Sequence, residues 1–156
     1  MRVAEWNEAY ARQVEAWRYE PPYDFYDAAS DPEDAAQARD PAMRDPARAG
    51  HCRAVLGESD RLEAFWYFDW HDEVVEVGIG LRPDLTGRRL GESFLHAQLE
   101  YALHHWDPAT FRLFVAAWNE RAIRLYERLG FREVARETRR FELVGEHEFI
   151  QMERAA

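Results

Sequence analysis

A strand, a glycine-containing turn and a helix follow one another between residues 74 and 106, and this succession constrains the fold more than any other part of the chain. Residues 74–81 form an apolar, mostly alternating run that is typical of a strand. Gly87 and Gly91 belong to the turn that follows. Apolar residues then recur at three- and four-residue intervals and predict a helix over residues 92–106 with one apolar face: Leu90, Phe94, Leu95, Leu99, Ala102, Leu103 and Trp106.

The N-terminus of the predicted helix is a candidate anion-binding site. The first N–H groups of a helix have no partner within it, and glycines before it let a ligand approach the backbone closely. A P-loop is excluded, because Gly91-Glu92-Ser93 lacks the required lysine. A dinucleotide fingerprint is excluded because Pro83 stands where a third glycine would be needed. We therefore expect a phosphorylated ligand of another kind, the alternative being a plain strand-to-helix connection.

A second strand and helix follow downstream. Residues 111–117 are mostly apolar and predict a buried strand. Asn119 is a good N-cap for the next helix, Glu120 suits its positive end, and Gly130 suits the left-handed residue after its C-terminus. The apolar stripe of this helix consists of Ala122, Leu125, Tyr126 and Leu129. A tyrosine in such a stripe is by default a core residue.

Together these two segments resemble the GNAT acetyltransferase superfamily. Thr86-Gly-Arg-Arg-Leu-Gly91 follows its phosphate-loop pattern Arg/Gln-x-x-Gly-x-Gly/Ala, except that Thr86 replaces Arg/Gln and Arg89 replaces the central glycine. The second signature, Asn-x-x-Ala-x-x-Leu-Tyr-x-x-x-Gly-Phe, is matched in full by Asn119, Ala122, Leu125, Tyr126, Gly130 and Phe131. The resemblance covers residues 51–156 well and the N-terminal third loosely.

The resemblance implies a single α/β domain over residues 1–156. Its GNAT-like fold would be a mixed, mainly antiparallel twisted sheet, flanked by helices and splayed at the acetyl-CoA site. Residues 51–156 would form the cofactor-binding core, and residues 1–50 a helical and loop region on the acceptor side. The implied reaction moves the acetyl group of acetyl-CoA to a primary amine of a small molecule, protein or peptide in a ternary complex, without a metal. The resemblance is also compatible with a homodimer.

The resemblance assigns the cofactor site to three segments. Ile79, Gly80 and Leu81 would hydrogen-bond the pantetheine arm, with the Leu81 N–H as oxyanion donor; internal glycines, which often mark a close ligand backbone, support this. The phosphates would lie on the turn and the helix N-terminus, at Thr86, Gly87, Arg88, Arg89, Leu90, Gly91 and Glu92. Asn119 would contact the cofactor arm. We expect Arg88 or Arg89 to bind a phosphate, and Arg89 to have a negative φ within the first helical turn.

Two side chains are expected to move protons. Tyr126 is the candidate general acid, because a phenol with a pKa of about 10 can protonate a departing thiolate with a pKa of about 8.5. An alkylammonium has a pKa of about 10.4 and must lose a proton before it attacks. Glu76 is the candidate general base, acting directly or through water, and Glu73 and Glu63 are its rivals. The alternative for all three is a solvated carboxylate.

Composition excludes several other classes of protein. The chain of 156 residues is 47% hydrophobic and is long enough for one domain with a core. Its net charge of −10 argues against nucleic-acid binding, which needs basic patches. Cys52 is the only cysteine, and residues 1–20 lack an apolar signal core, so we expect a cytoplasmic protein without disulfides. No apolar run is long enough to span a membrane.

Two functions without catalysis remain as alternatives to an enzyme. A non-catalytic module that senses or sequesters acyl-CoA would use the same cofactor site. A protein-interaction module that uses an acidic face would not bind CoA at all. The six histidines lack the spacing of a metal site.

The remaining elements follow from periodicity and turn residues. We predict a helix over residues 6–18 and a mobile loop over residues 28–49 that contains a short helix at 32–38. Strands are predicted at 51–57, 61–70 and 73–82, and a final hairpin at 132–143 and 146–152. The aromatic cluster of Trp17, Tyr19, Tyr23, Phe25 and Tyr26 either lines an acceptor cleft or forms a satellite core.

Overall fold

Seven strands form one mixed sheet in the computed structural model, which describes residues 1–156. Their order across the sheet is β1-β2-β3-β4-β5-β7-β6, and only the β4–β5 pair is parallel. The strands are β1 (Arg2–Glu5), β2 (His51–Leu56), β3 (Leu62–His71), β4 (Val74–Leu81), β5 (Thr110–Ala116), β6 (Arg132–Phe141) and β7 (Gly145–Ala155). The expected single α/β domain with a mixed, mainly antiparallel sheet is therefore confirmed.

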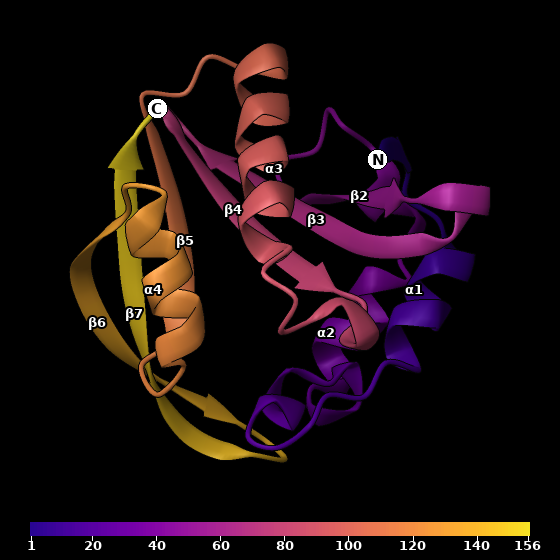
Figure 1. Ribbon diagram of the computed structural model, residues 1–156, viewed down its shortest axis with the longest axis horizontal. Helices are drawn as coiled ribbons and strands as arrows, with labels where there is room; N and C mark the ends of the chain where they lie inside the picture. Colours follow the sequence, from indigo (N-terminus) through magenta and orange to yellow (C-terminus); the bar gives the residue numbers. More distant parts are fainter.

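Four helices flank the sheet (Figure 1). The helices α3 (Gly91–His105) and α4 (Glu120–Arg128) lie in front of it in this view, whereas α1 (Glu8–Glu15) and α2 (Pro32–Ala38) lie on the side of β1–β3. Asn119 caps α4 by accepting a hydrogen bond from the N–H of Ala122, and Gly130 has a φ of 92° at its end, as the sequence predicted. None of these helices is long and apolar enough to cross a membrane.

The sheet divides between β4 and β5. These strands pair only where Val74–Glu76 faces Thr110–Arg112. Beyond that point β4 stays paired with β3, and β5 stays paired with β7, so the two halves of the sheet diverge (Figure 1). The space between residues 77–81 and residues 113–116 is called the wedge below. It is the splay that the family resemblance implied.

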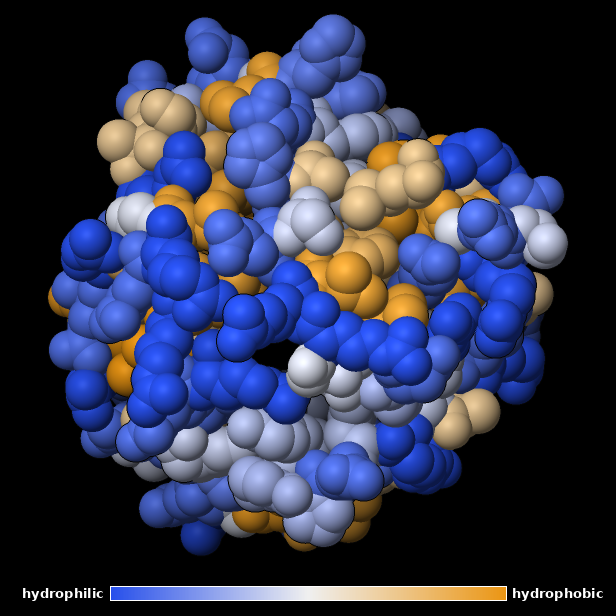
Figure 2. Space-filling model, viewed as in Figure 1, coloured by the Kyte–Doolittle hydropathy of each residue, from blue (hydrophilic) through white to orange (hydrophobic).

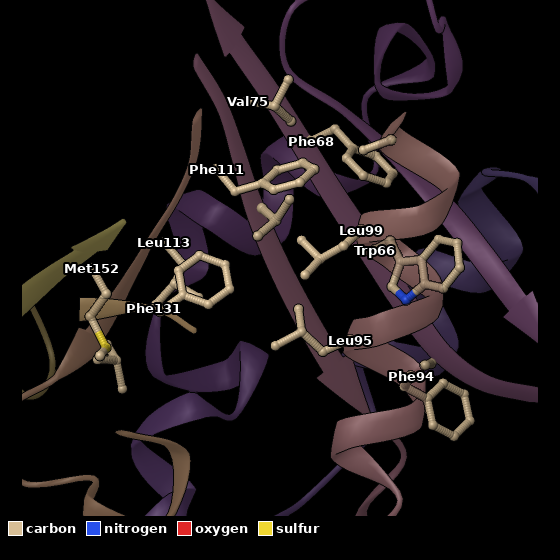
Figure 3. Close-up of a cluster of buried hydrophobic side chains, with 14 of the residues drawn as sticks. Trp66, Phe68, Val75, Phe94, Leu95, Leu99, Phe111, Leu113, Phe131 and Met152 are labelled. Carbon is tan, nitrogen blue, oxygen red and sulfur yellow. The ribbon is translucent and has the colours of Figure 1, made fainter. Parts of the chain in front are cut away.

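The larger core lies between the sheet and the helices α3 and α4 (Figure 3). Alternate side chains of the central strands, such as Trp66 and Phe68, point to this face and pack against Leu95 and Leu99 of α3. Phe131, which is fully buried, extends the core toward β7. Each such side chain stabilises the fold by about 1.5–3 kcal/mol when it leaves water. The core therefore holds the two halves of the sheet together on one side of the wedge.

The N-terminal segment differs most from the sequence prediction. The predicted helix at 6–18 is shorter, because Asn7 caps it and it spans only Glu8–Glu15. Residues Arg2–Glu5 form the edge strand β1, which the sequence analysis missed. Trp6 precedes the helix and is buried in a second, smaller core with Ala11 and Met43. A four-residue edge strand with charged ends has too few alternating apolar and polar residues to be recognised from the sequence.

The rest of the chain follows the predicted order with small shifts at the boundaries. The short helix at 32–38 is confirmed, and short 3-10 turns occupy residues 28–30 and 41–44 of the predicted loop. The final hairpin turns at Gly145, which has a φ of 79°. Its second strand, β7, inserts between β5 and β6, so β6 forms the edge of the sheet.

Candidate active site

The edge of β4 that faces the wedge carries unpaired backbone groups. The N–H of Arg82 donates to the C=O of Glu63 on β3 at 2.8 Å. Because successive backbone groups of a strand point to alternate sides, the N–H groups of Ile79 and Leu81 point away from β3, into the wedge. β5 has already diverged there, so no strand pairs with them. An extended ligand with amide groups could add to this edge as a strand does.

One of the two internal glycines of β4 has a different reason from the one expected. A Cβ atom at Gly80 would lie 2.2 Å from Cε1 of Phe65, so the glycine makes room for this ring. A Cβ atom at Gly78 would meet the Cβ of Tyr67 at 3.4 Å, an ordinary contact. Gly80 therefore serves packing on the face of the sheet that carries Phe65 and Tyr67, and it is no evidence for a ligand.

The turn before α3 is more strained than expected. Thr86 donates its hydroxyl to the C=O of Pro83 at 2.7 Å, and Gly87 has a φ of 74°. Arg89 has a φ of 60°, so the expectation of a negative φ was wrong. The physical reason is that α3 begins only at Gly91, which leaves Arg89 in the turn instead of the first helical turn. A left-handed conformation costs an arginine about 1–2 kcal/mol.

The N-terminus of α3 is left open toward the wedge. Leu90 occupies the cap position and supplies no side-chain hydrogen bond. The N–H groups of residues 91–93 consequently have no partner from a capping side chain, which is the arrangement that favours an anion. A Cβ atom at Gly91 would lie 3.1 Å from Cδ2 of Leu125, so this glycine lets α3 and α4 approach each other.

Three arginines near this helix terminus or on α4 have no acidic partner. Arg88, Arg89 and Arg121 take part in none of the ion pairs of the chain. The guanidinium of Arg121 lies 3.9 Å from the ring centroid of Tyr23. In a protein with a net charge of −10, unpaired arginines beside an open helix N-terminus favour an anionic ligand. The sequence analysis did not identify Arg121.

A cavity of about 700 Å³ runs through the wedge. Figure 2 shows an opening through the molecule where Figure 1 shows the wedge, and hydrophilic residues border much of it. Most of the predicted site residues line this cavity: Ile79, Gly80, Leu81, Thr86, Gly87, Arg89, Gly91, Glu92, Asn119 and Tyr126. Arg88, Leu90 and Glu76 do not line it. The structure thus brings together ten residues that were predicted from three separate segments of the chain.

Tyr126 presents its hydroxyl to the cavity. The ring packs against Phe131 at 6.3 Å between centroids. Its oxygen has no protein hydrogen-bond partner and is not among the fully enclosed polar atoms, so it is open to the cavity. Burial, with a smaller effect from Tyr26, raises the pKa of Tyr126 above its usual value, which keeps the phenol protonated. This state is the one that a general acid requires.

Glu76 lies beyond the closed end of the wedge. On β3 it faces Asp69, and on β5 it faces Arg112. Burial, and then the charge of Asp69, raise the pKa of Glu76. Its side chain shares a face of the sheet with Gly78, which lines the cavity about 6.6 Å further along the strand. Glu76 can therefore reach a reacting group in the cavity only through water.

The two rival carboxylates lie elsewhere. Glu63 covers Gly57, where a Cβ atom would lie 1.8 Å from its Oε1. Glu73 belongs to the hairpin turn between β3 and β4 and accepts hydrogen bonds from Ala109 and Thr110 through its backbone C=O. Neither side chain lines the cavity.

Two tyrosines of the N-terminal segment hold the two edges of the wedge. Tyr19 donates its hydroxyl to the C=O of Leu81 at 2.6 Å, on the β4 side. Tyr26 accepts a hydrogen bond from Nδ2 of Asn119 at 3.2 Å, beside β5. Burial raises the pKa of Tyr26, and hydrogen bonds from Asn119 and the N–H of Ala116 offset part of that rise. Their aromatic cluster was identified from the sequence, but these contacts have no sequence signal.

The members of the aromatic cluster lie in two different places. Trp17, Tyr19, Tyr23 and Tyr26 line the cavity. Phe25 instead packs at 5.2 Å from Phe141 and 4.5 Å from His147 between ring centroids, in a satellite core under the β6–β7 hairpin. The satellite core is therefore confirmed for Phe25 alone, and a role of the other four in an acceptor cleft stays a prediction.

Fold and site together define an enzyme class. Residues 2–132 match the family model described as the acetyltransferase (GNAT) domain. The chain therefore belongs to the GNAT acetyltransferase family.

Comparison with individual proteins agrees with this membership. The chain is 47% identical to the mycothiol acetyltransferase of Acidimicrobium ferrooxidans over 84 residues. The aligned region covers 49% of this chain and 27% of that protein. The chain thus spans about a quarter of the length of that relative. Among solved structures, a complex of the Vibrio cholerae spermidine N-acetyltransferase with CoA and spermine has a TM-score of 0.72 at 18% identity, covering 99% of this chain and 94% of that one. A putative phosphinothricin N-acetyltransferase has a TM-score of 0.61 at 18% identity, covering 69% and 68%.

Proposed function

We propose that this protein transfers the acetyl group of acetyl-CoA to a primary amine by direct attack within a ternary complex. The observation that carries the proposal is the free edge of β4, which opens into the same cavity as the hydroxyl of Tyr126. Residues 51–156 would bind the acetyl donor, and residues 1–50 would shape the acceptor side. Because the N-terminal segment encloses the cavity, a small-molecule amine fits better than a protein amine.

Acetyl-CoA supplies an activated thioester and several phosphates. The N–H groups of Ile79 and Leu81 are free to hydrogen-bond its amide-containing arm, and the N–H of Leu81 would stabilise negative charge on the thioester oxygen. The open N-terminus of α3 and the side chains of Arg89 and Arg121 would bind phosphate groups. The backbone N–H groups belong to β4 and α3, so their positions are set by secondary structure before a ligand binds.

The scheme for the proton transfers starts from a protonated Tyr126 and an ionised Glu76. The amine nitrogen would attack the carbonyl carbon, the C–S bond would break, and Tyr126 would give its proton to the departing thiolate. Glu76, whose pKa is raised by burial, would accept the proton that the amine loses, through a water molecule. The phenolate of Tyr126 would then recover a proton from the cavity water. No metal takes part in this scheme.

The proposal is tested by mixing the protein with acetyl-CoA and a panel of amines while measuring thiol release. An N-acetylated product, identified by mass spectrometry, would support it. CoA binding without transfer to any amine would instead favour the non-catalytic acyl-CoA-binding module. The absence of both binding and transfer would favour the protein-interaction module.

The only cysteine, Cys52, is buried and unpaired, which accords with a proposed cytoplasmic location.

A further inference from the structure

A histidine and two carboxylates meet on the β3–β4 hairpin, beyond the closed end of the wedge. Asp69 and His71 are two residues apart on β3, so their side chains share one face of the sheet. Glu76 is the cross-strand partner of Asp69 on β4, and its side chain lies on the same face. One nitrogen or oxygen atom of each side chain lies within 4.8 Å of the other two. Sequence spacing does not show this cluster, because strand pairing brings Glu76 to the other two residues.

The distances in the cluster suit a tetrahedral metal ion. Two ligand atoms that each lie about 2.0–2.2 Å from such an ion are separated by about 3.3–3.6 Å. Nε2 of His71 lies 3.4 Å from Oδ2 of Asp69, which falls within this range. Bringing the carboxylate of Glu76 equally close requires a shift of at most about 1.5 Å. Rotation about the side-chain bonds of Glu76 supplies such a shift, while the hairpin holds the backbone in place.

The nearby arginines do not neutralise the two carboxylates. Like charges that face each other across neighbouring strands are destabilising. Arg112 faces Glu76 from β5, but its ion pair is with Glu153 at 3.3 Å. Arg139 forms its ion pair with Glu137 at 2.6 Å. Glu76 takes part in no ion pair of the chain, so a cation can still bind between the two carboxylates.

The chemistry of the ligands favours an ion of the zinc type over Mg²⁺ or Ca²⁺. Hard cations prefer ligand sets made of oxygen alone, whereas an imidazole suits Zn²⁺ and related transition metals. Three protein ligands leave the fourth position of a tetrahedral ion to water. The hydroxyl of Tyr67 donates to Oδ2 of Asp69 at 3.2 Å, and hydrogen bonds of this kind orient ligand carboxylates in metal sites. His71 is exposed, so the ion has a path from solvent.

We infer that Asp69, His71 and Glu76 bind one divalent transition-metal ion of the zinc type, and that the bound ion inhibits acetyl transfer. A carboxylate that coordinates a metal ion does not accept the proton of the amine, so the ion removes Glu76 from its proposed role as the base. The inhibition rests on the proposed function, whereas the binding of the ion does not. The ion is an inhibitor and takes no part in the transfer.

Binding is tested by calorimetric titration of the protein with zinc chloride. The wild type should bind one Zn²⁺ per chain, and Mg²⁺ far more weakly. His71→Gln removes one ligand at an exposed position and should weaken Zn²⁺ binding by at least the 10- to 100-fold that is typical for loss of a mere partner of a ligand, as should Asp69→Asn. His96→Gln is the matched control, because His96 is exposed on α3 and lies outside the cluster. It should keep the wild-type affinity.

Equal affinity for Zn²⁺ in the wild type and in His71→Gln would mean adventitious binding only, and it overturns the inference. The absence of a site with one ion per chain in the wild type overturns it as well. Both results are independent of any acetyl transfer. Binding that depends on His71, in a protein that acetylates no amine, supports the metal site and refutes the enzyme.

Inhibition is tested by measuring acetyl transfer against the concentration of Zn²⁺. The wild type and His96→Gln should lose activity at concentrations that leave His71→Gln active, and a chelator should restore it. His71 lies outside the proposed catalytic groups, so His71→Gln should have wild-type activity without Zn²⁺. Equal inhibition of all three proteins, or binding at His71 without inhibition, overturns the inhibitory role of the ion.

Discussion

At the scale of single residues, Tyr126 is the side chain whose state is best matched to a chemical role. Its hydroxyl is open to the cavity, lacks a protein partner and is kept protonated by burial. We predict that Tyr126→Phe lowers kcat by about 10²–10⁴ and leaves the dissociation constant of CoA nearly unchanged. Steady-state kinetics and calorimetry measure the two effects. Tyr101→Phe is the control, because Tyr101 does not line the cavity. An unchanged kcat in Tyr126→Phe would mean that Tyr126 is a core residue without a catalytic role.

Arg89 combines an unfavourable backbone conformation with a favourable charge. Its φ of 60° suits glycine, whereas its positive charge belongs to a residue that lines the cavity. Arg89→Gly should therefore raise the free energy of unfolding by about 1 kcal/mol and at the same time weaken CoA binding. Thermal unfolding and calorimetry across a salt series measure the two effects.

The control for Arg89 is Arg88→Ala. Arg88 adjoins Arg89 in the turn but does not line the cavity, so its removal should change CoA affinity and its salt dependence much less. If the glycine variant bound CoA as tightly as the wild type at every salt concentration, Arg89 would not contact a phosphate. The left-handed backbone conformation of Arg89 would then be the only unusual feature of this position.

Glu76 allows a test in which stability and activity change in opposite directions. Its pKa is raised in the folded state, so the folded protein holds this proton more tightly than the unfolded chain. The group therefore lowers stability once the pH exceeds its unfolded pKa of about 4.3, and it has no such effect below that pH. Glu76→Gln should raise the midpoint of thermal unfolding at pH 7 but not at pH 3.

The same variant tests the role of Glu76 as a base. If the carboxylate accepts the amine proton through water, Glu76→Gln should lower kcat/KM and remove the limb of the pH–rate profile that reports its ionisation. A more stable protein with an unchanged pH profile would leave Glu76 as a structural carboxylate between Asp69 and Arg112. Glu63→Gln is the control, because Glu63 does not line the cavity and covers Gly57.

At the scale of elements, the segment between α1 and α2 contacts the β4 side of the wedge. Tyr19 connects it to β4 through the C=O of Leu81. Tyr19→Phe removes one neutral hydrogen bond, so we expect the KM of the acceptor to rise roughly two- to tenfold while CoA affinity changes little. Tyr10→Phe is a suitable control, since Tyr10 packs against Trp6 at 6.2 Å and does not line the cavity. An acceptor KM that stays constant in Tyr19→Phe would limit Tyr19 to a structural role.

The elements that the sequence predicted well are those whose signals are local. Asn119 and Gly130 define the ends of α4 by capping, and the apolar stripe defines α3. The order of the strands was not predicted, because no local signal shows that β7 inserts between β5 and β6. The strand β1 escaped notice because it is stabilised by its pairing with β2, a contact more than 40 residues away in the sequence.

The same distinction applies to the site. Tyr126 and the glycine turn were predicted because each belongs to a contiguous motif. Arg121 contacts Tyr23 only because the N-terminal segment folds over the wedge, and no spacing in the sequence reports that contact. The φ of Arg89 was mispredicted because α3 begins only at Gly91, so that Arg89 lies in the turn before the helix.

At the scale of the whole molecule, the wedge divides the sheet into two parts joined by a short parallel ladder and by the core. A ligand in the wedge would contact both parts, through the N–H groups of residues 79 and 81 on one side and through Arg121 on the other. Ligand that binds only the folded protein stabilises it by about 2.7 kcal/mol at a concentration 100-fold above its dissociation constant. We therefore expect CoA to raise the midpoint of thermal unfolding.

Hydrogen exchange can locate this stabilisation. In the presence of CoA, exchange should slow at the N–H groups of Ile79 and Leu81 and at residues 91–93, which have no partner in the free protein. The exposed turn of the β6–β7 hairpin lies at the far edge of the sheet and should not change, which makes it an internal control. No thermal shift at millimolar CoA would refute donor binding and the enzyme with it. A shift accompanied by slower exchange only outside the wedge would place the ligand elsewhere, because the free edge of β4 would then still be exposed to water.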